Sequence, residues 1–163
     1  MADGHGLTDR ELRTWRTFLG VATLLNQQVE QQLKDNAGLS HPQYEVLARL
    51  SNAPGGELRM TELAGVALTS KSGLSYQVTQ LEKAGLVRRR PCDTDDRGII
   101  AALTDAGWAK LRESAPDHVT LVRSAFVDSL TKEQFAALTT AVDALGTHLG
   151  LTGQTVTALR EQS

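Results

Sequence analysis

The stretch from Arg59 to Leu103 constrains the fold more than any other part of the chain, because two short helical segments there are followed directly by two short extended ones. The first helix is predicted over residues 59–67. The second, residues 70–84, repeats apolar side chains at helical spacing and stops before Gly85. A tight break at residues 68 and 69 separates the two. Two short helices joined by a turn and followed at once by a hairpin match a helix-turn-helix with a wing.

The predicted hairpin consists of two short strands on either side of a run of turn residues. Leu86 to Arg90 is the first strand, and the apolar run from Ile99 to Leu103 is the second. Between them, the sequence PCDTDDRG is rich in residues that favour turns. We expect these two strands to form the wing.

Amphipathic helices are predicted on both sides of this stretch. Capping boxes, in which Ser or Thr is followed three residues later by Glu or Gln, begin at Thr8, Ser40 and Thr131. A further helix begins at Thr104 and is expected to kink or restart at Pro116, because proline lacks the N–H that a helix interior needs. The predicted fold class is mainly α with a small β-hairpin. The length and the apolar content of 40% predict one folded unit over residues 1–163.

Positive charge is concentrated in the central segment, although the whole chain has a formal net charge of -2. Residues 70–90 carry five cationic side chains and one carboxylate, and residues 88–98 set four arginines beside three aspartates. Short hydroxyl and amide side chains flanked by cations suit a helix that lies in the major groove of DNA. Two other interpretations remain open: a solvated helix face, and a winged helix that binds a protein and no DNA.

The sequence resembles the MarR family of bacterial winged-helix transcriptional regulators. Four blocks carry the resemblance in the family's order: LSHPQYEVLARL, RMTELA, SKSGLSYQVTQLEKAGLVRRR and DDRGIIAALTDAG. The last two blocks are the specific ones. The resemblance implies a winged helix-turn-helix lobe over residues 39–103. It also implies dimerisation helices over residues 8–36 and 104–149, which interlock in a homodimer.

The resemblance also assigns the residues that contact double-stranded DNA. The second short helix and the hairpin would supply Ser70, Lys71, Ser72, Ser75, Tyr76, Gln80, Arg88, Arg89, Arg90 and Arg97. Arg97 would enter a minor groove at the wing tip, and Asp95 or Asp96 would hold its guanidinium in a fixed direction. Family members often have Arg where this chain has Tyr76 and Gln80, and a second Arg where it has Gly98. The resemblance therefore does not transfer an operator sequence.

Apolar stripes on the outer helices fit the implied homodimer. Residues 12–33 and 135–149 repeat apolar side chains at three- and four-residue spacing and have no partner within a winged-helix lobe. Burial between two subunits would remove this surface from water. The expected interface residues are Leu12, Phe135, Leu138, Val142, Leu145 and Leu149. The operator is then expected to be roughly palindromic, and the protein is expected to act as a repressor.

The family resemblance further implies a small-molecule effector of aromatic or anionic character. The candidate residues by position are Trp15, Leu19, His41, Tyr44 and Leu47. The structural alternative is the stronger one: Trp15 and Tyr44 would be core aromatics, and His41, within a capping box, would be exposed.

Redox sensing through Cys92 is a further alternative function. Neighbouring arginines favour its thiolate, whereas Asp93 and Asp95 oppose it. No metal, catalytic or cofactor site is predicted, because the four histidines are scattered and no triad or phosphate loop is present. We therefore expect a non-enzyme. The beginning of the chain does not resemble a secretory signal and no long apolar run is present, so a cytoplasmic protein without membrane contact is expected.

Overall fold

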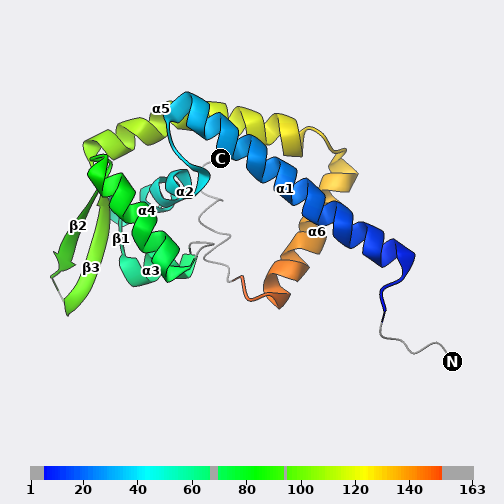
Figure 1. Ribbon diagram of the computed structural model, residues 1–163, viewed down its shortest axis with the longest axis horizontal. Helices are drawn as coiled ribbons and strands as arrows, with labels where there is room; N and C mark the ends of the chain where they lie inside the picture. Colours follow the sequence, from blue (N-terminus) through cyan, green and yellow to red (C-terminus); the bar gives the residue numbers. More distant parts are fainter. Residues whose placement is uncertain (1–5, 67–69, 94, 152–163) are drawn as a thin grey trace.

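The computed structural model describes residues 6–66, 70–93 and 95–151. Helices dominate the chain, and three short strands form one small sheet (Figure 1). The elements are α1 (Asp9–Ala37), α2 (His41–Ser51), the 3-10 turn η1 (Pro54–Gly56), β1 (Glu57–Arg59), α3 (Met60–Val66), α4 (Lys71–Lys83), β2 (Val87–Cys92), β3 (Asp95–Leu103), α5 (Asp105–Val122), the π-helical turn η2 (Arg123–Val127) and α6 (Lys132–His148). The predicted fold class, mainly α with a small β part, is confirmed. The predicted break at residues 68 and 69 lies outside the described residues.

A compact lobe is built from α2, α3, α4 and the sheet. The inward residues of these helices, together with Leu33 at the end of α1, form its hydrophobic core. Leu47, Leu50, Leu63 and Val78 are fully buried in it. Each such side chain contributes about 1.5–3 kcal/mol of transfer free energy on burial. This core fixes α4 at the surface of the lobe, beside the hairpin (Figure 1).

The sheet has one strand more than the sequence predicted. Its order is β1-β3-β2, with both pairs antiparallel, and Leu58 and Arg89 both lie opposite Ala101. Arg59, predicted to begin a helix, ends strand β1, and the helix begins at Met60. The strand has only three residues, which is too few to show the period-2 alternation that identifies strands in a sequence.

Helix α5 continues through Pro116, where a kink or restart was predicted. Proline removes the helical hydrogen bond to the carbonyl of residue 112, but both Pro116 and Arg112 are exposed, so water can satisfy that carbonyl. The predicted restart is therefore wrong, while the kink stays a prediction. The helical hydrogen-bond pattern changes later, at the π turn η2.

Thr104 ties the start of α5 to the loop before the wing. Its hydroxyl accepts the Gly107 N–H at 3.0 Å and donates to the Gly85 carbonyl at 2.6 Å. Its own N–H donates to the carbonyl of Leu86 at 3.1 Å. Gly107 sits so close to the Leu86 backbone that a Cβ there would overlap the carbonyl oxygen. The GLV part of the third sequence block and the LTDAG part of the fourth are therefore in direct contact.

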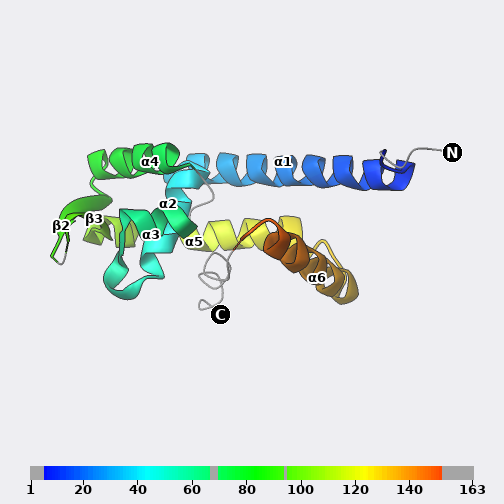
Figure 2. The same ribbon diagram turned by 90° about the horizontal axis from the view of Figure 1, so that it is seen from below.

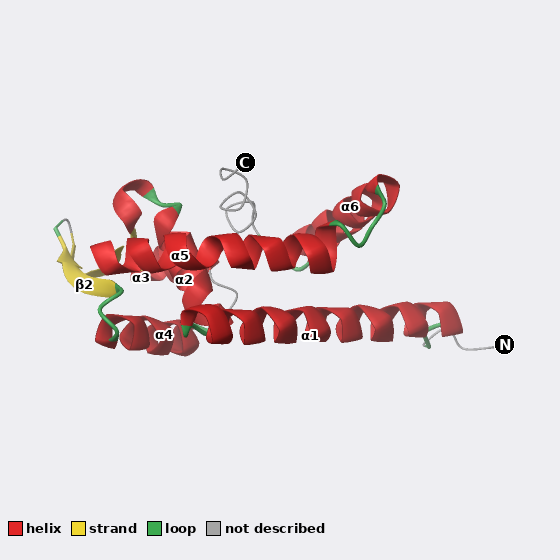
Figure 3. Cartoon of the chain, turned by 90° about the horizontal axis from the view of Figure 1, so that it is seen from above, coloured by secondary structure: helices red, strands yellow, loops and turns green. Residues whose placement is uncertain are grey.

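The outer helices extend away from the lobe. The carboxyl-terminal part of α1 packs along α5, whereas its amino-terminal half and all of α6 project beyond the lobe (Figures 1 and 2). The capping boxes predicted at Thr8, Ser40 and Thr131 are all present. Seen from above, α1 and α5 run side by side, and α6 turns away from both of them (Figure 3).

Candidate nucleic-acid interface

Helix α4 presents one polar face to solvent and buries the other. Its apolar residues Leu74, Val78 and Leu81 are each no more than 1% exposed. The opposite face carries Tyr76, which is 61% exposed, together with the exposed side chains of Lys71, Ser72 and Ser75 and the half-buried Gln80. The sequence periodicity anticipated this division. The outward face therefore offers hydroxyl, amide, phenol and ammonium groups to a partner.

The first turn of α4 is an N-terminal helix end with its cap in place. The Ser70 hydroxyl accepts the N–H of Gly73 at 3.1 Å and lies 3.2 Å from the Ser72 hydroxyl. Lys71 adds a cation to the positive end of the helix dipole. This end is electrostatically suited to a phosphate group.

The three consecutive arginines of β2 occupy different environments. Arg88 is exposed. The Arg89 guanidinium binds α4, with its Nη1 3.1 Å from Glu82 Oε2 and its Nη2 2.9 Å from Thr79 Oγ1. The Arg90 guanidinium pairs with Glu57 at 2.8 Å and with Asp93 at 3.1 Å, and these carboxylates raise the pKa of Arg90. Arg88 is thus the most accessible of the three cations.

At the wing tip, residues 95–97 are described by their backbone only. Asp95, Asp96 and Arg97 belong to β3, and Asp95 lies opposite Cys92. Their side chains, and residue 94, lie outside the described residues. The orienting role predicted for Asp95 or Asp96 remains a prediction.

The five residues predicted to bind an effector do not form one cluster in the structure. His41, Tyr44 and Leu47 lie on α2, and Leu47 is fully buried in the core. Trp15 and Leu19 lie in the amino-terminal half of α1 and are 52% and 44% exposed. Tyr44 is a core residue, as its structural alternative predicted, whereas Trp15 is not.

A small cavity of about 200 Å³ lies between α2 and α5. Tyr44 and Trp108 supply aromatic rings to it, Arg112 a guanidinium and Ser51 a hydroxyl, while Ala48, Leu111 and Ala115 complete the wall. Sequence reasoning missed Trp108 and Arg112 as pocket residues, because nothing in the sequence sets the rotation of α5 relative to α2.

A polar cluster where α2 meets α5 also went unpredicted. The ring of His118 lies 4.5 Å from that of Tyr44 and 6.4 Å from that of His41, measured between centroids. Burial lowers the pKa of His118, and the nearby His41 adds to this effect, while Glu45 opposes it. Glu45 accepts from Arg49 at 3.3 Å, and the pKa of Glu45 is lowered chiefly by its hydrogen bond with His41.

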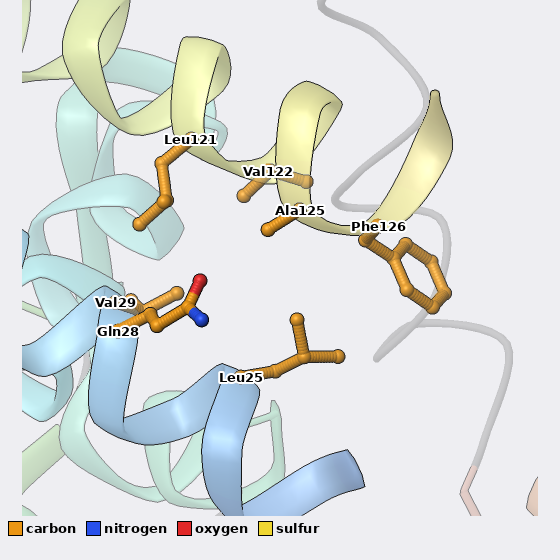
Figure 4. A pocket seen from close by; sticks show the side chains of 7 residues that line it. All are labelled: Leu25, Gln28, Val29, Leu121, Val122, Ala125 and Phe126. Atoms are coloured by element: carbon orange, nitrogen blue, oxygen red, sulfur yellow. The ribbon is translucent and has the colours of Figure 1, made fainter. Parts of the chain in front are cut away.

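The outer helices leave large apolar side chains uncovered. Val142, Leu145 and Leu149 of α6 are 44%, 50% and 74% exposed, and Leu12, Phe135 and Leu138 are half-buried. An apolar groove separates α1 from α5 and η2 (Figure 4). Its walls are Leu25, Gln28, Val29, Leu121, Val122, Ala125 and Phe126. Both the groove and α6 therefore expose apolar side chains.

Cys92 is buried at the end of β2. Among the described residues, no group of three or more His, Cys, Asp or Glu side chains is placed to hold a metal ion. Within the same residues, no helix combines the length and apolar character that crossing a bilayer requires.

Comparisons with known proteins agree with this architecture. A family model described as "MarR family" matches residues 37–98. The chain is similar to Sco3205, a MarR family transcriptional regulator from Streptomyces coelicolor whose structure was solved in complex with DNA. The two are 43% identical, the match covers 88% of this chain and 94% of that one, and the TM-score is 0.86. AbsC, a MarR family transcriptional regulator from the same organism, is 42% identical over 91% of this chain and 99% of its own, with a TM-score of 0.86.

A curated relative, the HTH-type transcriptional repressor YetL of Bacillus subtilis, is 31% identical over 97 residues. That match spans 60% of this chain and 58% of YetL. A second, the HTH-type transcriptional regulator PecS of Dickeya dadantii, is matched over 49% of its length. Winged-helix geometry, the motif blocks and the extensive identity with Sco3205 lead to one conclusion: the chain belongs to the MarR family of transcriptional regulators.

Proposed function

We propose that this regulator binds a double-stranded DNA operator as a homodimer and acts as a repressor. The observation that carries the proposal is the outward face of α4, where Lys71, Ser75 and Tyr76 are exposed beside the arginine-rich strand β2. Identity of 43% with a regulator solved on DNA supports it.

In this proposal the lobe of residues 39–103 is the DNA reader. Helix α4 lies in the major groove, where Ser72, Ser75, Tyr76 and Gln80 face base edges and Ser70 and Lys71 face phosphates. Arg88 contacts the backbone beside the groove, and Arg97 enters the adjacent minor groove. The paired guanidiniums of Arg89 and Arg90 are less available for such contacts.

The segments 8–36 and 104–149 form the dimer interface in the same proposal. The exposed apolar residues of α6 and the groove between α1 and α5 support it, since both would otherwise face water. A two-fold dimer presents two copies of α4 to half-sites about 34 Å apart, one turn of DNA. The operator is therefore roughly palindromic.

The test begins with selection of duplexes from a random DNA pool by the purified protein. The affinity for the selected duplex should fall steeply as salt rises, because phosphate contacts release counterions. Arg97→Ala should weaken binding by about 1–3 kcal/mol. The charge-matched control is Lys132→Ala, at the start of α6 and away from the lobe. A protein that selects no duplex would instead be a winged helix for protein partners.

We propose, secondly, that an aromatic acid regulates DNA binding from the cavity between α2 and α5. Two aromatic rings and the Arg112 guanidinium are the chemistry that such a ligand requires. The ligand would act only by preferring one arrangement of the lobes. In a Trp15→Phe protein, Trp108 is the remaining tryptophan, so its fluorescence reports binding of benzoic and phenolic acids directly. Arg112→Gln should abolish the response, and an unchanged titration would exclude this cavity.

A further inference from the structure

The guanidinium of Arg89 binds helix α4 through both of its terminal nitrogens. Its Nη2 donates to the Ser75 carbonyl oxygen at 2.9 Å and to Thr79 Oγ1 at 2.9 Å, and its Nη1 donates to Glu82 Oε2 at 3.1 Å. The backbone N–H of Arg89 donates to the other oxygen of the same carboxylate, Glu82 Oε1, at 2.9 Å. Four hydrogen bonds thus join one residue of the wing to one helix.

The three partners share a single face of α4. Ser75, Thr79 and Glu82 are spaced four and three residues apart, so they lie one above another along the helix. A planar guanidinium that contacts three residues spread over about two turns resists both rotation and sliding of the helix against the strand. The Thr79 hydroxyl adds a bond to the Ser75 carbonyl at 2.8 Å, which closes the network.

We propose that Arg89 and Glu82 are positioning residues that set the orientation of the recognition helix against the wing, and thereby its sequence specificity. This inference rests on the proposed DNA-binding function. Tyr76 and Gln80 each follow directly after a residue that Arg89 holds, so a small roll of α4 displaces both side chains from the base edges.

Arg88 provides the contrast within the same strand. It precedes Arg89, projects from the opposite side of β2 and is exposed, whereas the Arg89 side chain is 26% exposed. Charge on Arg88 is available to phosphates. Charge on Arg89 is balanced by Glu82, so the pair together offers no net attraction to DNA.

Glu82→Gln separates this role from a direct phosphate contact. Were Arg89 a phosphate ligand, the variant would release its guanidinium from a carboxylate and remove a negative charge, and DNA affinity would rise. For a positioning pair, the same variant loosens α4 and weakens operator binding. Glutamine has the size of glutamate, so the packing of the helix is preserved.

The experiment measures binding of the selected operator and of an unrelated duplex over a range of salt concentrations. Glu82→Gln and Arg89→Lys should each weaken operator binding about tenfold, the size of one strong charge-assisted hydrogen bond. Arg89→Lys keeps the charge of the pair, so it should leave binding to the unrelated duplex and the salt slope unchanged. Glu82→Gln leaves the charge of Arg89 unbalanced, so it should bind the unrelated duplex at least as tightly as the parent while binding the operator more weakly. Arg88→Gln is the matched control, and it should weaken both duplexes and reduce the salt slope by about 1.

Chemical denaturation of each variant accompanies these measurements, so that only folded protein is compared. Operator binding by Glu82→Gln that equals or exceeds the parent's would overturn the inference while leaving the proposed function intact. A salt slope reduced in Arg89→Lys as far as in Arg88→Gln would do the same. A parent that selects no duplex overturns the function and the inference together.

Discussion

At Gly107 the first turn of α5 approaches the backbone of Leu86 more closely than any side chain permits. The contact follows from the Thr104 cap, whose hydroxyl and N–H together hold the Gly85–Leu86 loop. Gly107 has an ordinary helical backbone, so its conformation does not require glycine. Glycine is required there only because a larger side chain would not fit. A single hydrogen atom as the side chain is what allows the wing and the long helix to meet.

Gly107→Ala should therefore destabilise the protein by about 3 kcal/mol, the upper range for overpacking against a neighbour that cannot move aside. Urea denaturation followed by circular dichroism measures the change. Gly20→Ala is the control, because a Cβ at that helical position meets nothing within 4 Å. Equal stability of the Gly107 variant and the parent would show that the Leu86 loop yields at little cost.

His118 predicts a pH dependence of stability. Burial lowers its pKa below the ordinary value of 6.5, so the unfolded chain takes up a proton that the folded chain resists. At neutral pH the histidine is neutral in both states and does not lower the free energy of unfolding. As the pH falls below about 6.5, the unfolded chain binds a proton first, and the free energy of unfolding decreases. His118→Phe should flatten the fall in denaturation midpoint between about pH 7.5 and 5. His148→Phe, at the exposed end of α6, is the matched substitution control.

At the level of elements, the outward face of α4, which we propose contacts DNA bases, carries few cations. Tyr76 and Gln80 are uncharged, so in the proposed complex attraction to phosphate depends on Lys71 and on the neighbouring strand. Polar neutral groups favour base discrimination over general attraction to phosphate. This element is expected to bind unrelated DNA weakly.

Gln80→Arg tests that expectation. The added cation should tighten binding to an unrelated duplex and steepen the salt slope by about 1, with a smaller gain on the selected operator. The ratio of the two affinities should therefore fall. Fluorescence anisotropy with both duplexes at several salt concentrations measures this ratio. Lys132→Arg, which keeps its charge on α6, should leave it unaltered.

Element positions followed from the sequence wherever periodicity and capping agreed. Thr8, Ser40 and Thr131 opened helices as predicted, and Leu74, Val78 and Leu81 pointed inward. Strand β1 escaped prediction because its identity depends on an edge of β3 that lies far away in the sequence. The continuity of α5 escaped it because solvent exposure at Pro116 is a tertiary property.

The sequence predicted which residue types the candidate site contains. It did not predict which of these side chains pair with each other. The run of three arginines is visible in the sequence, but the division between the exposed Arg88 and the paired Arg89 and Arg90 depends on which face of β2 meets α4. Likewise, His118 and Arg112 joined Tyr44 only through the packing of α5 on α2.

For the whole molecule, the proposed homodimer depends on the apolar surface of α6. Leu145→Asp or Leu138→Asp should convert a dimer into a monomer, because a carboxylate cannot be buried there without a partner. Sedimentation velocity distinguishes the dimer from the monomer. Thr140→Asp, on the opposite side of the same helix, should remain dimeric. Dimers persisting in both leucine variants would place the interface on another surface.

The length of helix α5 determines how far movement at one of its ends displaces the other. Its 18 residues span about 27 Å, from the Thr104 cap beside the wing to the π turn beside the apolar groove. A rod of that length works as a lever arm, because a tilt of about 5° at one end displaces the other by about 2 Å. A displacement of that size is enough to form or break a hydrogen bond to a base. Because α5 stays helical through Pro116, its two ends belong to one element.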